Sequence, residues 1–164
     1  QAVAEFLQPF GVELTGIASQ ARQQAPFSKV LAMDALAAQL ASADYVVNLL
    51  PDTPATQNIY DAKAFAAMQA SAVFINAGRG VAVVDADLVS ALQQQQIAAA
   101  VIDVCRQEPL PAGHMFWHAP NLLLTGHSSA PTQPALMAQL FIDNLQRFNK
   151  GERLYGAVDF ARGY

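Results

Sequence analysis

The sequence predicts an α/β fold, in which helices cover both faces of a parallel β-sheet. Short apolar runs rich in β-branched residues alternate along the chain with segments of helical spacing, and this alternation is typical of such sheets. Hydrophobic residues make up 53% of the 164 residues and charged residues only 13%, which is enough apolar material for one buried core. The same balance excludes a largely disordered chain.

The first half of the chain contains three of the predicted strands. Apolar residues at helical spacing predict a helix over Gln1–Pro9, which Pro9-Phe10-Gly11 ends. Asp34 is the expected N-cap of a later helix over Ala35–Ser42. The predicted strands lie at Val12–Ala18, Val30–Met33 and Tyr45–Leu50.

The second half continues the alternation and ends in a long helix. Asp85 is the expected N-cap of a helix that runs to about Gln94, and three prolines between residues 109 and 120 mark an irregular connection. A further helix is predicted at Asp61–Met68, and strands are predicted at Ala72–Asn76, Ile97–Val104 and Leu122–Thr125. In the last predicted helix, Gln133–Asn149, the side expected to be buried is formed by Leu136, Leu140, Ile142, Leu145 and Phe148.

Polar or glycine- and proline-rich turns follow the predicted strands. In parallel α/β sheets, ligands bind beyond the carboxyl ends of the strands. We therefore expect a nucleotide-type ligand site at that edge of the sheet. The turns in question are Ala18-Ser19, Leu50-Pro51, Asn76–Arg79, Asp103–Glu108 and Gly126-His127.

Charge and cysteine content narrow the possible partners and location. The net charge is −4 and no cluster of Lys and Arg is present, which argues against a nucleic-acid partner. No apolar run approaches the ~20 residues of a membrane helix, and Gln1–Phe10 does not have the pattern of a signal peptide, so no membrane partner is expected. The single cysteine, Cys105, forms no internal disulfide and indicates a cytoplasmic protein.

Five motifs occur in a fixed order along nearly the whole chain. They are Leu49-Leu50-Pro51-Asp52-Thr53-Pro54-Ala55-Thr56, Asn76-Ala77-Gly78-Arg79-Gly80 with Asp85 and Leu88, Ile102-Asp103-Val104, Glu108-Pro109-Leu110-Pro111 and Thr125-Gly126-His127-Ser128-Ser129-Ala130. This series resembles the D-isomer-specific 2-hydroxyacid dehydrogenase family, whose nucleotide domain has a Rossmann-like, doubly wound parallel sheet. The ending, residues 151–164, is similar to the family's glyoxylate/hydroxypyruvate reductase branch.

The resemblance implies a hydride transfer between NAD(P)H and the carbonyl carbon of a small 2-oxo acid, which forms a D-2-hydroxy acid. Arg79 is expected to hold the substrate carboxylate, and His127 to donate a proton to the carbonyl oxygen. Glu108 is expected to orient the imidazole and to favour its charged form. Taken alone, Arg79 also fits an ordinary turn arginine, and the other two fit structural or solvated residues. Gly126 departs from the family, which commonly has proline before this histidine.

The resemblance also implies a set of cofactor contacts. Asp103 is expected to contact the nicotinamide carboxamide, although a loop-capping aspartate remains a rival interpretation. NAD-preferring enzymes carry an acid at the end of the second strand, where this chain has Ala18. Ser19 and Arg22 are able to bind a 2′-phosphate, so NADP is favoured over NAD, unless Arg22 is an ordinary loop charge. The remaining expected contacts are Leu50, Pro51, Thr56, Ala77, Gly78 and Ser129.

By the same resemblance, the glycine-rich phosphate turn and the strand before it precede residue 1, so the sheet is expected to be incomplete at its N-terminus. Residues 1–130 then form most of the NAD(P)-binding domain. Residues 131–164 form a long helix and a tail that return to a substrate domain largely outside this chain. We do not expect these 164 residues alone to be active. We expect a homodimer that forms through the nucleotide-binding domain.

Several alternatives remain open from the sequence. A nucleotide-sensing protein of the same fold can retain the same three residues, so they do not exclude it, and a truncated dimeric scaffold needs none of them. His114 and His118 are spaced as a metal pair, but no Cys or carboxylate ligand stands at a suitable spacing, so no metal site is expected. Cys105 is expected to be a small buried side chain, and Phe116-Trp117 a packing or subunit contact.

Overall fold

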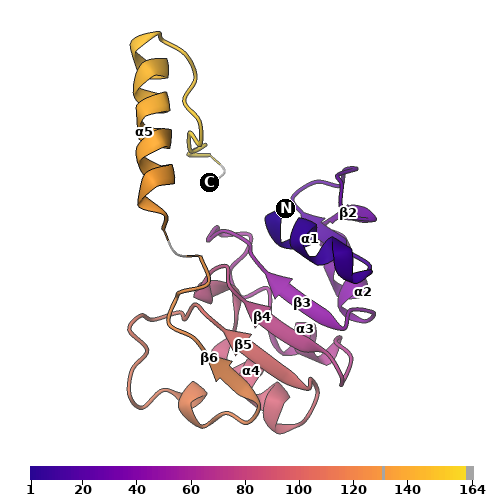
Figure 1. Ribbon diagram of the computed structural model, residues 1–164. Coiled ribbons are helices and arrows are strands. Elements are labelled where there is room, and N and C mark those ends of the chain that lie inside the picture. Colours follow the sequence, from indigo (N-terminus) through magenta and orange to yellow (C-terminus); the bar gives the residue numbers. More distant parts are fainter. Residues whose placement is uncertain (131, 162–164) are drawn as a thin grey trace.

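The computed structural model describes residues 1–130 and 132–161, and the strands in this part of the chain all pair in parallel (Figure 1). Strands β1 (Thr15–Ala18) and β2 (Lys29–Ala32) form one sheet. A second sheet has the order β3-β4-β5-β6. Its strands are β3 (Tyr45–Asn48), β4 (Val73–Asn76), β5 (Ala99–Ile102) and β6 (Leu122–Leu124). Every predicted strand is present, and the predicted Rossmann-like parallel fold is confirmed.

The sheet is divided between β1 and β3. In the common doubly wound order 3-2-1-4-5-6, β1 and β2 take the places of strands 2 and 3, and β3 to β5 take those of strands 4 to 6. The division therefore falls where this order has its first strand. The resemblance leads us to expect an interruption of the sheet at this position, and the structure shows one there.

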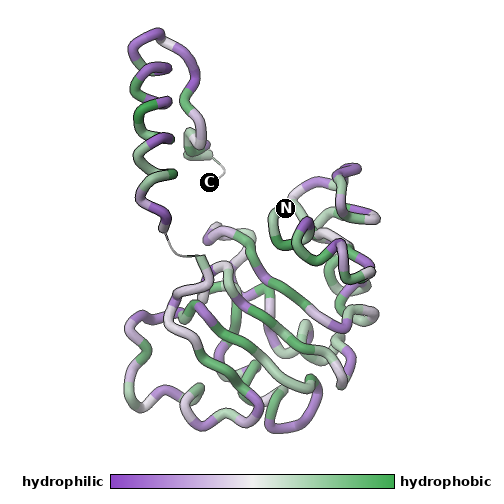
Figure 2. Tube along the Cα trace, in the orientation of Figure 1, coloured by the Kyte–Doolittle hydropathy of each residue, from purple (hydrophilic) through white to green (hydrophobic). Residues whose placement is uncertain are grey.

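The core lies between the second sheet and helices α3 (Ala62–Ala66) and α4 (Asp85–Gln93). Side chains of a strand alternate between the two faces of a sheet, and the apolar residues on the helix side are buried in β3, β4 and β5 and partly buried in β6. Phe74 of β4 lies at the centre, with its ring 4.7 Å from that of Tyr60 and 5.4 Å from that of Phe65. In Figure 2 the strands are coloured mostly as hydrophobic, as this burial requires.

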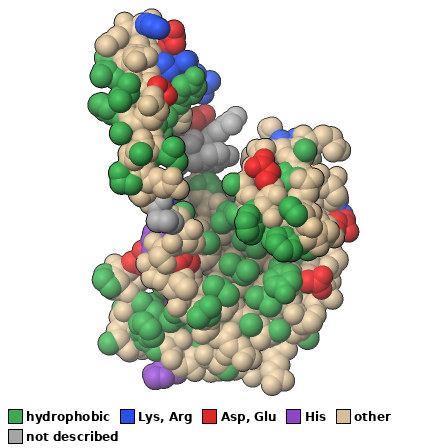
Figure 3. All heavy atoms as spheres, in the orientation of Figure 1, with side chains coloured by type: hydrophobic (Ala, Val, Ile, Leu, Met, Phe, Trp, Pro, Cys, Tyr) green, Lys and Arg blue, Asp and Glu red, His purple; other side chains and the backbone are tan. Residues whose placement is uncertain are grey.

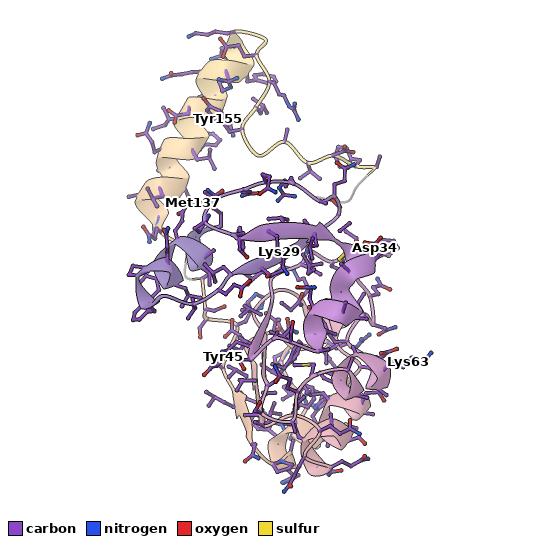
Figure 4. The ribbon with its side chains drawn as sticks, turned by 90° about the vertical axis from the view of Figure 1, so that its right-hand side faces the viewer. Lys29, Asp34, Tyr45, Lys63, Met137 and Tyr155 are labelled. Carbon is purple, nitrogen blue, oxygen red and sulfur yellow. The ribbon has the colours of Figure 1, made fainter. Side chains whose placement is uncertain are left out.

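The opposite face of the second sheet carries apolar side chains that remain accessible. The burial along β3 alternates, so that Val46 is buried while Tyr45 is 69% exposed. Val47 and Leu123 belong to the same face and are also exposed. Figure 4 shows Tyr45 on this sheet and Lys63, on α3, extending to solvent.

Both predicted N-caps, Asp34 and Asp85, are wrong, whereas Asp61, which was not predicted as a cap, has this role. Asp61 caps α3, because its Oδ1 accepts a hydrogen bond of 2.9 Å from the Ala64 amide. Asp34 lies inside a 3-10 turn (η2, Met33–Ala35), so Ala35 is the N-cap of α2 (Leu36–Leu40), with no side-chain bond. Asp85 is the first residue of α4 and does not cap it; its carboxylate contacts His114 instead.

The last helix, α5 (Pro134–Asn149), begins one residue later than predicted, and none of its described residues is buried. The side predicted to be buried is 39–70% exposed, which overturns that prediction. The helix stands away from both sheets (Figures 1 and 3), and residues 150–161 run back beside it. Arg147 holds this return through Glu152 at 3.3 Å and through the ring of Tyr155. The regularly spaced apolar residues of α5 are typical of a contact surface, and among the described residues no segment packs against them. Residues 162–164 of the predicted tail lie outside the described residues.

The other short helices connect these elements. Among the described residues, no helix combines the length and apolar character needed to cross a membrane. These short helices are α1 (Ala2–Leu7), η1 (Gln8–Phe10), η3 (Gly80–Ala82) and η4 (Met115–His118).

Asp61 caps a helix and Asp34 does not, and this assignment can be tested by substitution. We expect Asp61→Ala to lower the free energy of unfolding by about 1 kcal/mol, because the Ala64 amide loses its capping acceptor. Asp34→Ala is the matched control, since Asp34 caps neither η2 nor α2, and it should leave stability within about 0.5 kcal/mol of wild type. Urea denaturation measures both. Equal losses in the two variants would contradict the assignment of the cap.

Candidate active site

Three turns at the carboxyl edge of the second sheet carry the predicted catalytic residues. Arg79 follows β4, Glu108 follows β5 and His127 follows β6. Parallel strands present their carboxyl ends at the same edge, so residues far apart in the sequence meet there.

His127 and Glu108 form a direct pair. His127 Nδ1 lies 2.8 Å from Glu108 Oε2, and Glu108 Oε1 accepts a bond of 2.8 Å from the amide of Cys105. The hydrogen bond from His127 and then the one from this amide lower the pKa of Glu108, so the carboxylate stays ionised. The side chains of His127 and Glu108 are 55% and 41% exposed, which leaves them open to a ligand. With Nδ1 engaged, Nε2 has no hydrogen-bond partner within the described part of the chain.

The backbone at His127 is unusual. Its φ is 54°, in the left-handed region that residues with a side chain rarely adopt, and its amide donates to the carbonyl oxygen of Asp103 at 2.8 Å. Such conformations are held by their surroundings and gather at functional sites. Gly126, the departure from the family, does not have positive φ, and a Cβ there would meet no atom within 4 Å. The conformation of His127 therefore does not depend on the missing Cβ at residue 126.

Asp103 holds the turn that carries His127. The carboxylate is buried, and its Oδ1 accepts from Thr125 Oγ1 at 2.5 Å and from the Ser128 amide at 3.0 Å. Its Oδ2 accepts from the amide and the Oγ of Ser129, at 3.0 and 2.6 Å. These bonds hold the pKa of Asp103 far below its usual range. The geometry is that of a loop-capping aspartate, and contact with a nicotinamide stays a prediction.

Two buried asparagines, which the sequence reasoning missed as site residues, connect the neighbouring turns. Asn48 and Asn76 are 1% and 0% exposed, and Asn48 Nδ2 donates to Asn76 Oδ1 at 2.9 Å. Asn48 Oδ1 also accepts from the Leu50 amide, and Asn76 bonds to the Gly78 amide and the Arg79 carbonyl. A signal was present, because each asparagine lies two residues after a buried apolar residue and so faces the core.

The position of Arg79 depends on the backbone of its turn, because its side chain makes few contacts. Its guanidinium makes one hydrogen bond to the described residues, from Nη1 to the Gly78 carbonyl at 2.7 Å, and no ion pair with them. It is exposed, so the charge is available to an anion. Gly78 permits this placement, because a Cβ there would lie 2.9 Å from the Leu50 carbonyl oxygen.

The predicted cofactor residues fall into two groups. Leu50, Ala77 and Gly78 lie together beside Arg79, through the Gly78 contact and the Asn48 bonds. Thr56 is buried and closes the loop through a bond of 2.6 Å from its Oγ1 to the Pro51 carbonyl. Ser129 is bound to Asp103, as described above.

The second group lies in the other sheet. Ser19 and Arg22 follow β1 and are both exposed. Arg22 Nε donates to Gln24 Oε1 at 2.7 Å, and the Arg22 amide bonds to the Val30 carbonyl. Among the described residues, no ion pair involves Arg22, so its charge is not neutralised there.

The histidine pair considered for a metal has a different arrangement. His114 Nε2 lies 3.2 Å from Asp85 Oδ2, and its Nδ1 accepts from the Phe116 amide at 3.3 Å, so both ring nitrogens are engaged. Burial raises the pKa of Asp85, against the charges of His114 and Arg106. Residues 1–130 and 132–161 contain no group of three His, Cys, Asp or Glu side chains arranged for a metal ion. Phe116 belongs to the core, as the packing interpretation predicts.

Cys105 is half-buried, and burial raises the pKa of its thiol. The thiol form therefore dominates, which is the opposite of what a nucleophile needs.

The divided parallel sheet with its polar turns at one edge defines the class of this domain as dinucleotide-binding. The family model described as "D-isomer specific 2-hydroxyacid dehydrogenase, NAD binding domain" matches residues 1–129. The chain belongs to the D-isomer-specific 2-hydroxyacid dehydrogenase family.

Individual relatives agree with this assignment. Glyoxylate/hydroxypyruvate reductase A of Yersinia enterocolitica is 33% identical over 164 residues, which cover 100% of this chain and 52% of that protein. A solved D-isomer specific 2-hydroxyacid dehydrogenase family protein from Aeromonas salmonicida has a TM-score of 0.92 at 39% identity, over 98% of this chain and 52% of its own. The NADPH-dependent glyoxylate/hydroxypyruvate reductase from Sinorhizobium meliloti, in complex with NADP and sulfate, has a TM-score of 0.88 at 32% identity, over 100% and 53%. The chain thus spans about half the length of these relatives.

The four bonds to Asp103 lead to a stability prediction. An amide in its place cannot accept from both backbone donors, the amides of Ser128 and Ser129, so we expect Asp103→Asn to lower the free energy of unfolding by about 1–3 kcal/mol. The control is Asp44→Asn, because Asp44 is an exposed loop residue.

The pH dependence of this loss follows from the lowered pKa. Because folding lowers the pKa of Asp103, its stabilisation is complete above the unfolded-state value of about 3.9 and is lost as the pH falls through the lower folded-state value. The difference between wild type and Asp103→Asn should be constant above about pH 5 and should shrink in strong acid. Urea denaturation at several pH values measures it, and a difference that grows on acidification would refute the role of the carboxylate.

Proposed function

We propose that the protein is an NAD(P)H-dependent reductase of small 2-oxo acids, of the glyoxylate or hydroxypyruvate type. One observation carries the proposal: the hydrogen-bonded pair of His127 and Glu108 lies at the same sheet edge as Arg79, whose charge is free of ion pairs with the described residues. An acid and an anion-binding group at one sheet edge suit a substrate that has a carboxylate next to a carbonyl. The names of the Yersinia and Sinorhizobium relatives point to the same substrate class.

The residues present fit a nicotinamide cofactor at this edge. Leu50, Pro51 and Ala77 are half-buried apolar residues beside the Arg79 turn, a suitable surface for an aromatic ring. NADPH, when bound, supplies the hydride that the carbonyl carbon accepts. The contribution of the chain itself is to bind the acid, orient it and deliver one proton.

Each catalytic residue has a separate task in this reaction. Arg79 binds the substrate carboxylate, for which a guanidinium has two parallel donors, and draws charge from the adjacent carbonyl. His127 gives its proton from Nε2 to the carbonyl oxygen, so that the 2-oxo acid, a hydride and a proton together form the 2-hydroxy acid. Glu108 accepts from Nδ1, which fixes the ring and stabilises the imidazolium before the transfer.

NADP is the proposed cofactor, in preference to NAD. Ala18 ends β1 without the acid that would bind ribose hydroxyls and repel a 2′-phosphate. Ser19 and Arg22 follow it, both exposed, and together offer a hydroxyl and a guanidinium to the phosphate. The complex of the Sinorhizobium relative with NADP supports this choice.

We propose the same domain division that the sequence indicates. Residues 1–130 form most of the NAD(P)-binding domain, and the family match over residues 1–129 supports this boundary. Residues 131–164 serve as a helix and tail that pack on a substrate domain, which accounts for the exposed apolar side chains of α5. Homodimer formation through the nucleotide-binding domain and a cytoplasmic location complete the proposal.

The first test is turnover by the intact protein with NADPH and glyoxylate, hydroxypyruvate or pyruvate, followed through the absorbance of the reduced cofactor. His127→Ala should lower kcat by about 10²–10⁴-fold, because the general acid is lost, while the dissociation constant of NADPH is unchanged. Arg79→Ala should raise KM for the oxo acid and lower kcat. His118→Ala is the control, since this histidine is exposed and lies in η4. Cofactor binding without turnover would indicate a sensor instead, and neither binding nor turnover would indicate a scaffold.

The second test concerns the 2′-phosphate. We expect Arg22→Gln to weaken NADPH binding by about tenfold or more, as for the loss of one charge-assisted bond, and to leave NADH binding unchanged. Titration of cofactor fluorescence measures both constants. Arg153→Gln, which removes an exposed arginine from the C-terminal return, is the control for net charge. An equal loss of affinity for both cofactors would exclude a role of Arg22 in phosphate recognition.

A further inference from the structure

Arg106 lies two residues before Glu108, and its side chain reaches back to the segment that follows Arg79. Its Nη2 lies 2.9 Å from the carbonyl oxygen of Val81 and also bonds to that of Val83. The same nitrogen lies 2.5 Å from Asn58 Oδ1. One cationic nitrogen thus has acceptors from two other segments around it.

The backbones of the two turns also touch directly. Gly80, the residue after Arg79, packs so closely on the peptide between Cys105 and Arg106 that a Cβ would lie 2.1 Å from the Cys105 carbonyl carbon and 2.3 Å from the Arg106 nitrogen. Only glycine allows this approach. The turn of Arg79 therefore packs directly on the turn of Glu108, and the Arg106 side chain adds hydrogen bonds between the same two segments.

A third segment joins this arrangement. The Asn58 amide donates to the Val81 carbonyl, and the Tyr60 amide donates to that of Ala82, each at 2.9 Å. Arg106 therefore binds a carbonyl, that of Val81, which already belongs to a backbone pairing. We call this set of contacts, formed by Asn58, Gly80, Val81, Val83 and Arg106, the inter-turn clamp.

We propose that Arg106 is a positioning residue, which fixes Arg79 relative to the pair of Glu108 and His127. This inference rests on the proposed function. Among the described residues, the Arg79 side chain makes one hydrogen bond, to the neighbouring Gly78 carbonyl, so its location depends mainly on the backbone of its turn. Glu108 is tied to its own turn through the Cys105 amide. The clamp is the contact that relates these two turns to each other.

The consequences for catalysis are specific. A displacement of about 1 Å between a substrate-binding group and the proton donor lowers rates by up to about a hundredfold. In the intact protein, Arg106→Met keeps most of the aliphatic stem and removes every donor. We expect its kcat/KM for the oxo acid to fall by about tenfold or more, through both KM and kcat, with the dissociation constant of NADPH unchanged.

Rescue by lysine separates this role from simple packing. All three acceptors surround the single atom Nη2, so the ammonium of Arg106→Lys can donate to the same oxygens, and kcat/KM should return toward the wild-type value. Gln107→Ala changes the adjacent exposed residue of the same turn and is the matched control, with unchanged kinetics. If Arg106→Met does not fold, Arg106→Gln serves as the second variant.

Two further measurements test whether the effect passes through Arg79. In an Arg79→Lys background, Arg106→Met should have a much smaller effect than in the wild type, because the group it positions is already altered. Independently of activity, amide hydrogen exchange at Ala82 and Val83, whose amides bond to the carbonyls of Arg79 and Gly80, should accelerate in Arg106→Met. Exchange within β4 and β5 should not change.

The outcomes are distinguishable. Wild-type kinetics in Arg106→Met, or an effect that adds fully to that of Arg79→Lys, would overturn the proposal. Failure of lysine to rescue a folded variant would also overturn it. If the wild-type protein shows no turnover while exchange at Ala82 and Val83 still accelerates, the proposed function is refuted and Arg106 is a structural clamp only.

Discussion

The buried polar side chains at the carboxyl ends of three strands are the constraint on which the site depends. Asn48, Asn76 and Asp103 each end or follow a strand and are almost fully buried. A buried amide or carboxylate must find hydrogen-bond partners, and here the partners are mainly the backbones of the turns that follow. Satisfying these groups therefore fixes the turns themselves. The amide pair of Asn48 and Asn76 joins the first two turns, and the four bonds to Asp103 form the turn that holds His127.

The irregular connection between β5 and β6 is ordered by a different means. It lacks the regular backbone pairing of a sheet, so side chains anchor it instead. Arg106 attaches its beginning to the segment after Arg79, the contact of His114 with Asp85 attaches its middle to α4, and Phe116 inserts into the core. Trp117 donates back to the Pro111 carbonyl. The Glu108 side chain is thus presented from a loop that is held along its length, although the loop has little secondary structure.

The molecule combines ordered turns at the carboxyl edge of the second sheet with apolar surfaces that remain exposed. The helix-covered side of the second sheet is packed as a normal core, whereas its opposite face and α5 leave large apolar side chains exposed. Exposed apolar surface on this scale marks a place of interaction. The buried groups that order the turns of Arg79 and His127 belong to the packed part, so these turns do not require the exposed apolar surfaces to be covered.

The sequence by itself determined the order and type of nearly all elements, and it singled out the three residues that we propose as catalytic. Hydrophobic periodicity reports local conformation, and the motifs around Arg79, Glu108 and His127 report the family. The tertiary structure decided what each polar group contacts. It assigned the cap of α3 to Asp61 and none to Asp34, directed Asp103 to the His127 turn, and joined Arg106 to Asn58, a contact across 48 residues. It also left α5 exposed. The physical reason is that the chemistry of an apolar stripe or a charged side chain indicates the type of partner it requires. Which residue becomes that partner depends on the folded chain, which brings distant segments together.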